Sequence, residues 1–182
     1  MKIEETRSEF KATLLQPAKP GSDDSWTFLV LPKSASEKLP RRGRTSVIGS
    51  LNGQSFQITL EPDGQLSHWL KVSDELRQSA NAGIGDEVSV TLQSVDQEPE
   101  PEVPADLEAA LASAPESLAV WNDTTTIARL DWIHWVVSAK REKTRATRIE
   151  NACDMLASGK RRVCCFDQSG FYSKSLSAPK AL

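Results

Sequence analysis

Positively charged side chains gather in the last quarter of the chain, where they could hold an acidic group. Four of them, Lys140, Arg141, Arg145 and Arg148, are the candidate partner-binding residues. Arg141, Arg145 and Arg148 are spaced i, i+4, i+7, so a continuous helix would carry them on one face. Guanidinium groups bind phosphates and carboxylates through paired hydrogen bonds. This pattern indicates a docking site for an acidic protein or a nucleic acid, with an affinity that falls as the salt concentration rises.

Two structural explanations of the same residues stay open. The positive side chains could form a solvated helix face that pairs with acidic side chains of the protein itself. In the second explanation Thr144 caps the helix, and Arg145 and Arg148 join the helices through ion pairs with Asp106 or Asp131. If the arginines bind a partner, replacing them with Ala abolishes binding without unfolding the protein. If they are structural, the same change lowers the melting temperature.

Aromatic and histidine side chains define a second candidate site. A pocket lined by His68, Trp69, Trp132 and His134, between the two halves of the chain, would suit a small-molecule-binding protein or a weak enzyme. Such a pocket requires these four residues to meet at one place. The alternative is that the tryptophans are core residues, because large aromatic side chains at helical spacing are mostly buried.

Other kinds of chemistry find little support in the residue pattern. Neither histidine lies in a nucleophile or metal motif, and the cysteines lack the C-x-x-C spacing of structural zinc sites. Cys164 and Cys165 are adjacent, so we expect that their thiols do not readily bridge each other. Gly83-Ile84-Gly85 lacks the lysine and the long helix of a phosphate-binding loop. The sequence therefore favours a non-enzymatic protein with no catalytic residue, no metal and no cofactor.

Strands and helices that could position these residues occupy separate parts of the chain. The first 97 residues alternate β-branched and aromatic runs with turn signals, and Asn52-Gly53 between two runs predicts a tight hairpin. Residues 31–51 and 70–92 share a strand, short helix, turn and strand, and two such units would interlock into a small closed barrel of about six strands. The strands are expected at residues 9–15, 26–31, 45–51, 54–60, 66–72 and 87–95.

Helical periodicity follows a segment of alternating proline and glutamate at residues 98–104. Three helices are expected, at residues 104–114, about 126–141 and about 144–158, and they would form a small bundle. The sequence thus predicts an α+β fold with a β-barrel domain at 1–97, a linker at 98–104, a helical domain at 105–160 and a basic tail at 161–182. Whether that tail packs on a domain stays open.

Composition and charge limit the class of protein. The chain has 182 residues, 38% of them hydrophobic, with a formal net charge of −3, as in ordinary globular proteins. Residues 1–138 carry 12 basic and 21 acidic side chains, whereas residues 139–182 carry 10 and 4. No apolar run reaches the roughly 18 residues of a membrane span. The acidic start of the chain resembles no secretory signal and the three cysteines are a poor disulfide framework, so we expect a cytoplasmic protein.

Two motif sets resemble known families. The stretch AKREKTRATRI at residues 139–149, followed by MLASGK at 155–160, resembles the YdeI or OmpD-associated family, also labelled bacteriocin-protection-like. VPADL at 103–107 is similar to the opening of that domain. The segments FKA at 10–12, WTFLVLP at 26–32, GSLNG at 49–53 and GDEVSV at 85–90 are similar to DUF1905, a domain of unknown function that often precedes it. These resemblances imply a small β-barrel, a stress-protection or interaction role, and no established catalytic activity.

Overall fold

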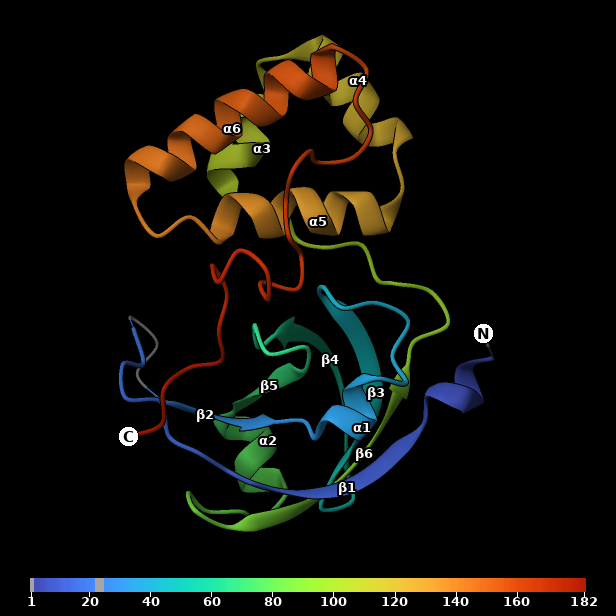
Figure 1. Ribbon diagram of the computed structural model, residues 1–182, viewed down its shortest axis with the longest axis vertical. Helices are drawn as coiled ribbons and strands as arrows, with labels where there is room; N and C mark the ends of the chain where they lie inside the picture. The colour runs from blue at the N-terminus through green and yellow to red at the C-terminus, as the bar shows by residue number, and fades with distance from the viewer. Residues whose placement is uncertain (1, 22–24) are drawn as a thin grey trace. The chain divides into compact units, whose positions relative to one another are not determined.

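The chain forms two compact units in the computed structural model, which describes residues 2–21 and 25–182. The first unit contains residues 1–97 together with residues 169–182, and the second contains residues 98–168. Strands make up most of the first unit and helices make up the second, as Figure 1 shows. The fold is therefore α+β, as the sequence predicted. None of the helices in the described residues has the length and apolar character needed to cross a membrane.

Six antiparallel strands build the sheet of the first unit, and their spatial order is β1-β6-β3-β4-β5-β2. Each of the six predicted runs overlaps one of them. Their inward-facing leucines and valines form the core, with Leu29, Leu70 and Leu92 almost fully buried. The strands are β1 (Ser8–Thr13), β2 (Trp26–Val30), β3 (Thr45–Leu51), β4 (Gln54–Pro62), β5 (His68–Ser73) and β6 (Glu87–Ser94).

The prediction of a closed barrel was wrong, because the sheet is an open half-barrel. Within the described residues, the two outer strands β1 and β2 are joined by one isolated bridge, between Leu15 and Phe28. Strand β4 pairs with β3 from Gln54 to Leu60, but it pairs with β5 at Glu61 and Pro62 alone. The sheet therefore bends where β4 changes partner, and its edges do not form a continuous ladder.

Local backbone requirements explain the central hairpin. Asn52 and Gly53 have φ angles of 47° and 84°, as the two-residue turn between β3 and β4 requires. Gly49 in β3 lies so close to strand β6 that a Cβ atom there would come within 1.9 Å of the Thr91 carbonyl oxygen. A side chain at position 49 would push these two strands apart.

The two similar segments found in the sequence are both present. They are β2–α1–β3 and β5–α2–β6, with α1 at Lys33–Ser36 and α2 at Asp74–Ser79. β2 pairs with β5 and β3 pairs with β6, so the two segments interlock as predicted. Ser73 caps α2, since its Oγ accepts the Leu76 N–H at 3.2 Å, whereas α1 follows Pro32 without a side-chain cap. A 3-10 helix, η1 (Ile3–Thr6), precedes β1.

Four helices form the second unit: α3 (Ala105–Ala112), α4 (Pro115–Asp123), α5 (Thr126–Val137) and α6 (Glu142–Ala157). Their core contains Leu107, Trp132 and Leu156, which are completely buried. The sequence did not predict α4, because Pro115 ends α3 and also occupies the first turn of the next helix. The predicted cap at Thr144 was also wrong, since α6 begins at Glu142 and places Thr144 within its first turn.

The C-terminal tail packs on the first unit. The Ala18 N–H donates to the Lys180 carbonyl oxygen and the Leu182 N–H donates to the Gln16 carbonyl oxygen, each at 2.8 Å. Leu176 lies against Gly64 so closely that a Cβ atom at position 64 would clash with its backbone. The sequence left open whether the tail packs on a domain, and residues 169–182 do so.

Candidate partner-binding surface

Arg145 is engaged within its own unit. Its Nε donates to Asp106 Oδ2 at 2.7 Å and its Nη2 donates to Oδ1 at 3.0 Å, so the pair is bidentate and joins α6 to α3. The hydrogen bond from Arg145 holds the pKa of Asp106 below its ordinary value. This is one of the ion pairs that the structural explanation predicted, and that part of the explanation is confirmed.

Arg148 joins α6 to the end of α5. Its Nη1 donates to the Trp135 carbonyl oxygen at 2.7 Å and to Ser138 Oγ at 3.1 Å, and its guanidinium carbon lies 5.5 Å from the centre of a Trp135 ring. A positive group at the last carbonyls of a helix stabilises that helix. Arg148 therefore supports the bundle through a main-chain acceptor, whereas Asp131 accepts a hydrogen bond from Gln168 at 2.9 Å.

Three cations at the start of α6 have a different environment. Lys140, Arg141 and Lys143, called the cation cluster below, are all exposed. Within the described residues their side chains make no hydrogen bond or ion pair. The backbone of Arg141 is the N-cap of α6, and no side chain caps the first turn of this 16-residue helix. The cluster thus combines three available positive charges with the positive end of a helix dipole.

The side of α6 that faces α3 has the opposite electrostatic character. A hollow of about 590 Å³ lies there, with carboxylates from Asp106, Glu142 and Glu150 around the guanidinium of Arg145. Negative charge therefore predominates in the hollow, and an acidic partner would be repelled from it. Of the four residues predicted to bind a partner, Lys140 and Arg141 are available, while Arg145 and Arg148 have partners within the second unit.

His68 is a buried part of the first unit. It is 0% exposed, its Nε2 lies 2.8 Å from the Gly43 carbonyl oxygen, and its Nδ1 lies 2.7 Å from Ser36 Oγ. A carbonyl oxygen can accept but not donate, so Nε2 carries the proton and Nδ1 accepts the Ser36 hydroxyl. This serine–histidine pair resembles a nucleophile and its base. However, Ser36 is 1% exposed, and burial lowers the pKa of His68, so the pair functions as a neutral structural contact.

The other aromatic residues of the predicted pocket lie in packed clusters of their own units. In the first unit, Trp69 is half-buried and stacks on Trp26, with 6.2 Å between ring centres. In the second, Trp132 is 0% exposed and donates its Nε1–H to the Arg161 carbonyl oxygen at 3.3 Å. His134 is also buried, and its ring meets Phe166 edge to face. Burial of His68, Trp132 and His134 favours the core interpretation of these residues over the pocket.

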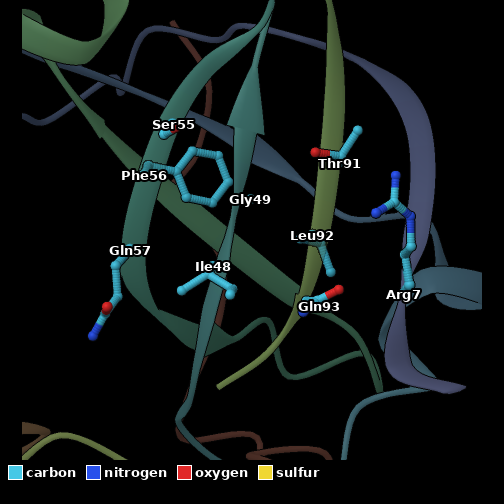
Figure 2. A pocket seen from close by; sticks show the side chains of 9 residues that line it. All are labelled: Arg7, Ile48, Gly49, Ser55, Phe56, Gln57, Thr91, Leu92 and Gln93. Atoms are coloured by element: carbon cyan, nitrogen blue, oxygen red, sulfur yellow. The ribbon is translucent and has the colours of Figure 1, made fainter. Parts of the chain in front are cut away.

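A polar hollow of about 480 Å³ lies over strands β3, β4 and β6 (Figure 2). The strand register places Gln57, Ile48 and Gln93 in one row across these strands. Thr91 adds a hydroxyl group, and Arg7 lies at one side of the view. The described residues that line this hollow include no carboxylate, histidine or cysteine, so it offers hydrogen bonds without an acid, base or thiol nucleophile.

The fold and this surface define a two-unit protein that carries an open half-barrel and a helical unit with an exposed cation cluster. Residues 10–92 match the family profile described as a domain of unknown function, DUF1905. Residues 100–159 match the profile described as bacteriocin-protection, YdeI or OmpD-associated. The chain therefore has a YdeI/OmpD-associated domain preceded by a DUF1905 domain, in the order that the sequence motifs predicted. No curated protein matches the chain.

Proposed function

We propose that this is a non-enzymatic binding protein whose cation cluster docks an acidic segment of a partner protein, as part of a protective role. The observation that carries the proposal is the state of Lys140, Arg141 and Lys143. They are exposed and unengaged within the described residues, beside an uncapped helix start, while the neighbouring arginines hold the bundle together. Carboxylates are favoured at such a helix start by charge and by its free N–H groups.

The matched family supports an interaction role. Its description contains bacteriocin protection and association with OmpD, and neither phrase names a reaction. The buried serine–histidine pair and the polar hollow on the sheet add no accessible catalytic group. Protection through binding agrees with this description and with the available cation cluster.

An acidic protein suits the surface better than a nucleic acid. Residues 98–168 contain 9 Lys plus Arg and 12 Asp plus Glu, so the whole helical unit is acidic and would repel an extended polyanion. Trp132 is buried and cannot stack on a base. A short carboxylate-rich segment can contact the cation cluster alone and avoid the acidic hollow beside Arg145.

We also propose that the protein acts in the cytoplasm. Its three cysteines, Cys153, Cys164 and Cys165, are all unbridged, which suits a reducing compartment. Fractionation of the native host, with detection of the untagged protein, tests this location. Recovery from an extracytoplasmic fraction would contradict it.

A binding titration with two probes tests the docking proposal. The probes are a short fluorescent polyglutamate peptide of a few residues and a short single-stranded oligonucleotide of similar charge, each titrated at several salt concentrations. We expect the double variant K140A/R141A to bind polyglutamate about two- to thirtyfold more weakly than the unaltered protein, since each of the two exposed ion pairs contributes about 0.2–1 kcal/mol. We also expect a smaller salt dependence in this variant, because fewer charges are neutralised.

The matched control is K160A/R162A, which removes one lysine and one arginine from the exposed segment after α6. It should bind polyglutamate with nearly unchanged affinity. Equal losses in both variants would show that only the total charge matters, and the cluster would not be the site. Preference for the oligonucleotide would replace the protein partner with a nucleic acid.

A further inference from the structure

Cys164 and Cys165 form an exposed pair of thiols in the segment that follows α6. Both side chains are exposed, and their sulfur atoms lie 2.9 Å apart. The sequence led us to expect two thiols that do not readily bridge each other. In the structure the two sulfurs are in contact, and Cys165 has a φ of 61°, in the left-handed region that non-glycine residues seldom occupy.

The chain on both sides of the pair is anchored within the second unit. Before it, the Arg161 carbonyl oxygen accepts the Thr124 hydroxyl at 2.9 Å and the Trp132 Nε1–H at 3.3 Å. After it, the Phe166 ring packs edge to face on His134, with 5.0 Å between ring centres. The thiol pair is therefore presented to solvent by a segment that is fixed at both ends.

We propose that Cys164 and Cys165 are a two-electron redox site that reacts with low-molecular-weight disulfides of the glutathione type. This proposal is independent of the docking function proposed above. Two features carry it: the contact between the sulfurs and their exposure to solvent. An exposed thiol is accessible to a small disulfide, and a second thiol in contact with it can complete the exchange within the chain.

The reaction balances as two successive exchanges. One of the two thiolates attacks one sulfur of the small disulfide, a new sulfur–sulfur bond forms as the disulfide's own bond breaks, and one small thiolate leaves and takes up a proton. The thiolate of the other cysteine then attacks the Sγ atom of the first, the bond to the small molecule breaks, and a second small thiolate leaves and takes up a proton. The protein loses two hydrogens and two electrons, and the small disulfide is reduced to two thiols.

The roles of the two cysteines follow from their contact. The hydrogen bond to Cys164 raises the pKa of the Cys165 thiol above its ordinary value. Because both thiols are exposed and in contact, either can make the first attack, and the other then closes the ring. Cys153 takes no part, because it is half-buried on α6 and burial raises the pKa of its thiol.

Mass spectrometry of the full chain tests the site. The reduced protein is incubated with oxidised and reduced glutathione at several ratios, quenched with acid, and compared with the variants C153S, C164S and C165S. We expect the unaltered protein and C153S to lose two hydrogens and to carry no glutathione adduct. Peptide mapping should place the new disulfide between residues 164 and 165. C165S and C164S should each stop at a glutathione adduct on the one remaining thiol of the pair.

The role of the fold is measured by repeating the equilibrium in concentrated guanidinium chloride. We expect the folded protein to favour the closed ring by at least about tenfold over the unfolded chain, which corresponds to about 30 mV for a two-electron couple. Stable glutathione adducts on the unaltered protein, or disulfide-linked dimers, would overturn the proposal. Equal ring closure in the folded and unfolded chains would also overturn it, because the contact in the folded protein would then not favour formation of the disulfide.

Discussion

One set of polar side chains in each unit shows two contrasting ways of satisfying a polar group. In the first unit, Ser36 and His68 are fully buried and satisfied by each other and by a main-chain carbonyl. In the second unit, Arg129, Arg145 and Arg148 lie near the surface and connect different segments. The comparison shows that a candidate functional residue is best judged by whether its own unit already supplies its partner.

A physical difference between sheets and helices underlies this contrast. Backbone hydrogen bonds join neighbouring strands, so the sheet fixes its own geometry and can enclose a small polar network. Helices satisfy their backbone groups internally, and side chains must determine how they pack against one another. Arginines in a helical unit are therefore often needed for structure, and those without partners stand out as binding candidates.

Replacement of Trp132 by Ala should have the largest effect and tests its assignment to the core. The change removes a completely buried ring and its hydrogen bond to Arg161, so we expect the helical unit to lose about 3–5 kcal/mol of unfolding free energy. Urea unfolding followed by far-UV circular dichroism measures this loss. W132F keeps most of the buried ring and should cost far less. A fully stable W132A would show that Trp132 lies outside the core.

Replacement of His68 by Ala should destabilise the first unit by about 2–3 kcal/mol, because the Ser36 hydroxyl and the Gly43 carbonyl lose their buried partner. The pH dependence sharpens this test. Burial lowers the pKa of His68, so the unfolded chain takes up a proton first as pH falls below about 6.5. Stability present above that pH should therefore decline below it. H68A should lack this decline, whereas an unchanged pH profile in H68A would contradict the buried neutral histidine.

Acid should have a smaller effect on the helical unit, through Glu100 and Asp106. Hydrogen bonds from Arg129 and Arg145 lower the pKa values of these carboxyl groups, so the stabilisation they give is present above about pH 4.3 and is lost as pH falls through the folded pKa values. Both carboxylates are about half exposed, so we expect less than about 1 kcal/mol for each pair. Thermal unfolding of E100Q should show a weaker acid dependence than that of the unaltered protein, and high salt should reduce the difference. An identical acid dependence in E100Q would show that Glu100 does not contribute to the loss of stability in acid.

Local sequence signals predicted the elements well. The Asn52-Gly53 pair determined the hairpin, because few other residues accept the required φ angles. Closure of the sheet could not be predicted in the same way, since it depends on pairing between β1 and β2, which follow each other in the chain but lie at opposite edges of the sheet. The sequence did not predict α4, because proline ends helices and also occupies their first turn, and Pro115 does both.

The sequence predicted which residues belong to the candidate site. It did not predict which of them have partners within the protein and which are available to bind another molecule. Spacing predicted one helix face for Arg141, Arg145 and Arg148, but Arg141 is the extended N-cap of α6 and only the other two lie on the helix. The expectation that Asp106 pairs with an arginine was confirmed. The partner of Arg148 is a main-chain carbonyl, which no side-chain pattern reveals. Adjacency also gave no indication that the sulfurs of Cys164 and Cys165, which are unbridged, would be in contact.

Polyglutamate affinity of K140A/R141A compared with R145A/R148A tests the central claim most directly. Each variant removes two positive charges from the same region, so a general electrostatic attraction would weaken both equally. At a temperature where circular dichroism shows both to be folded, we predict that K140A/R141A loses affinity and that R145A/R148A keeps it while melting at a lower temperature. Loss of binding in R145A/R148A, with unchanged melting and with binding retained in K140A/R141A, would contradict the account.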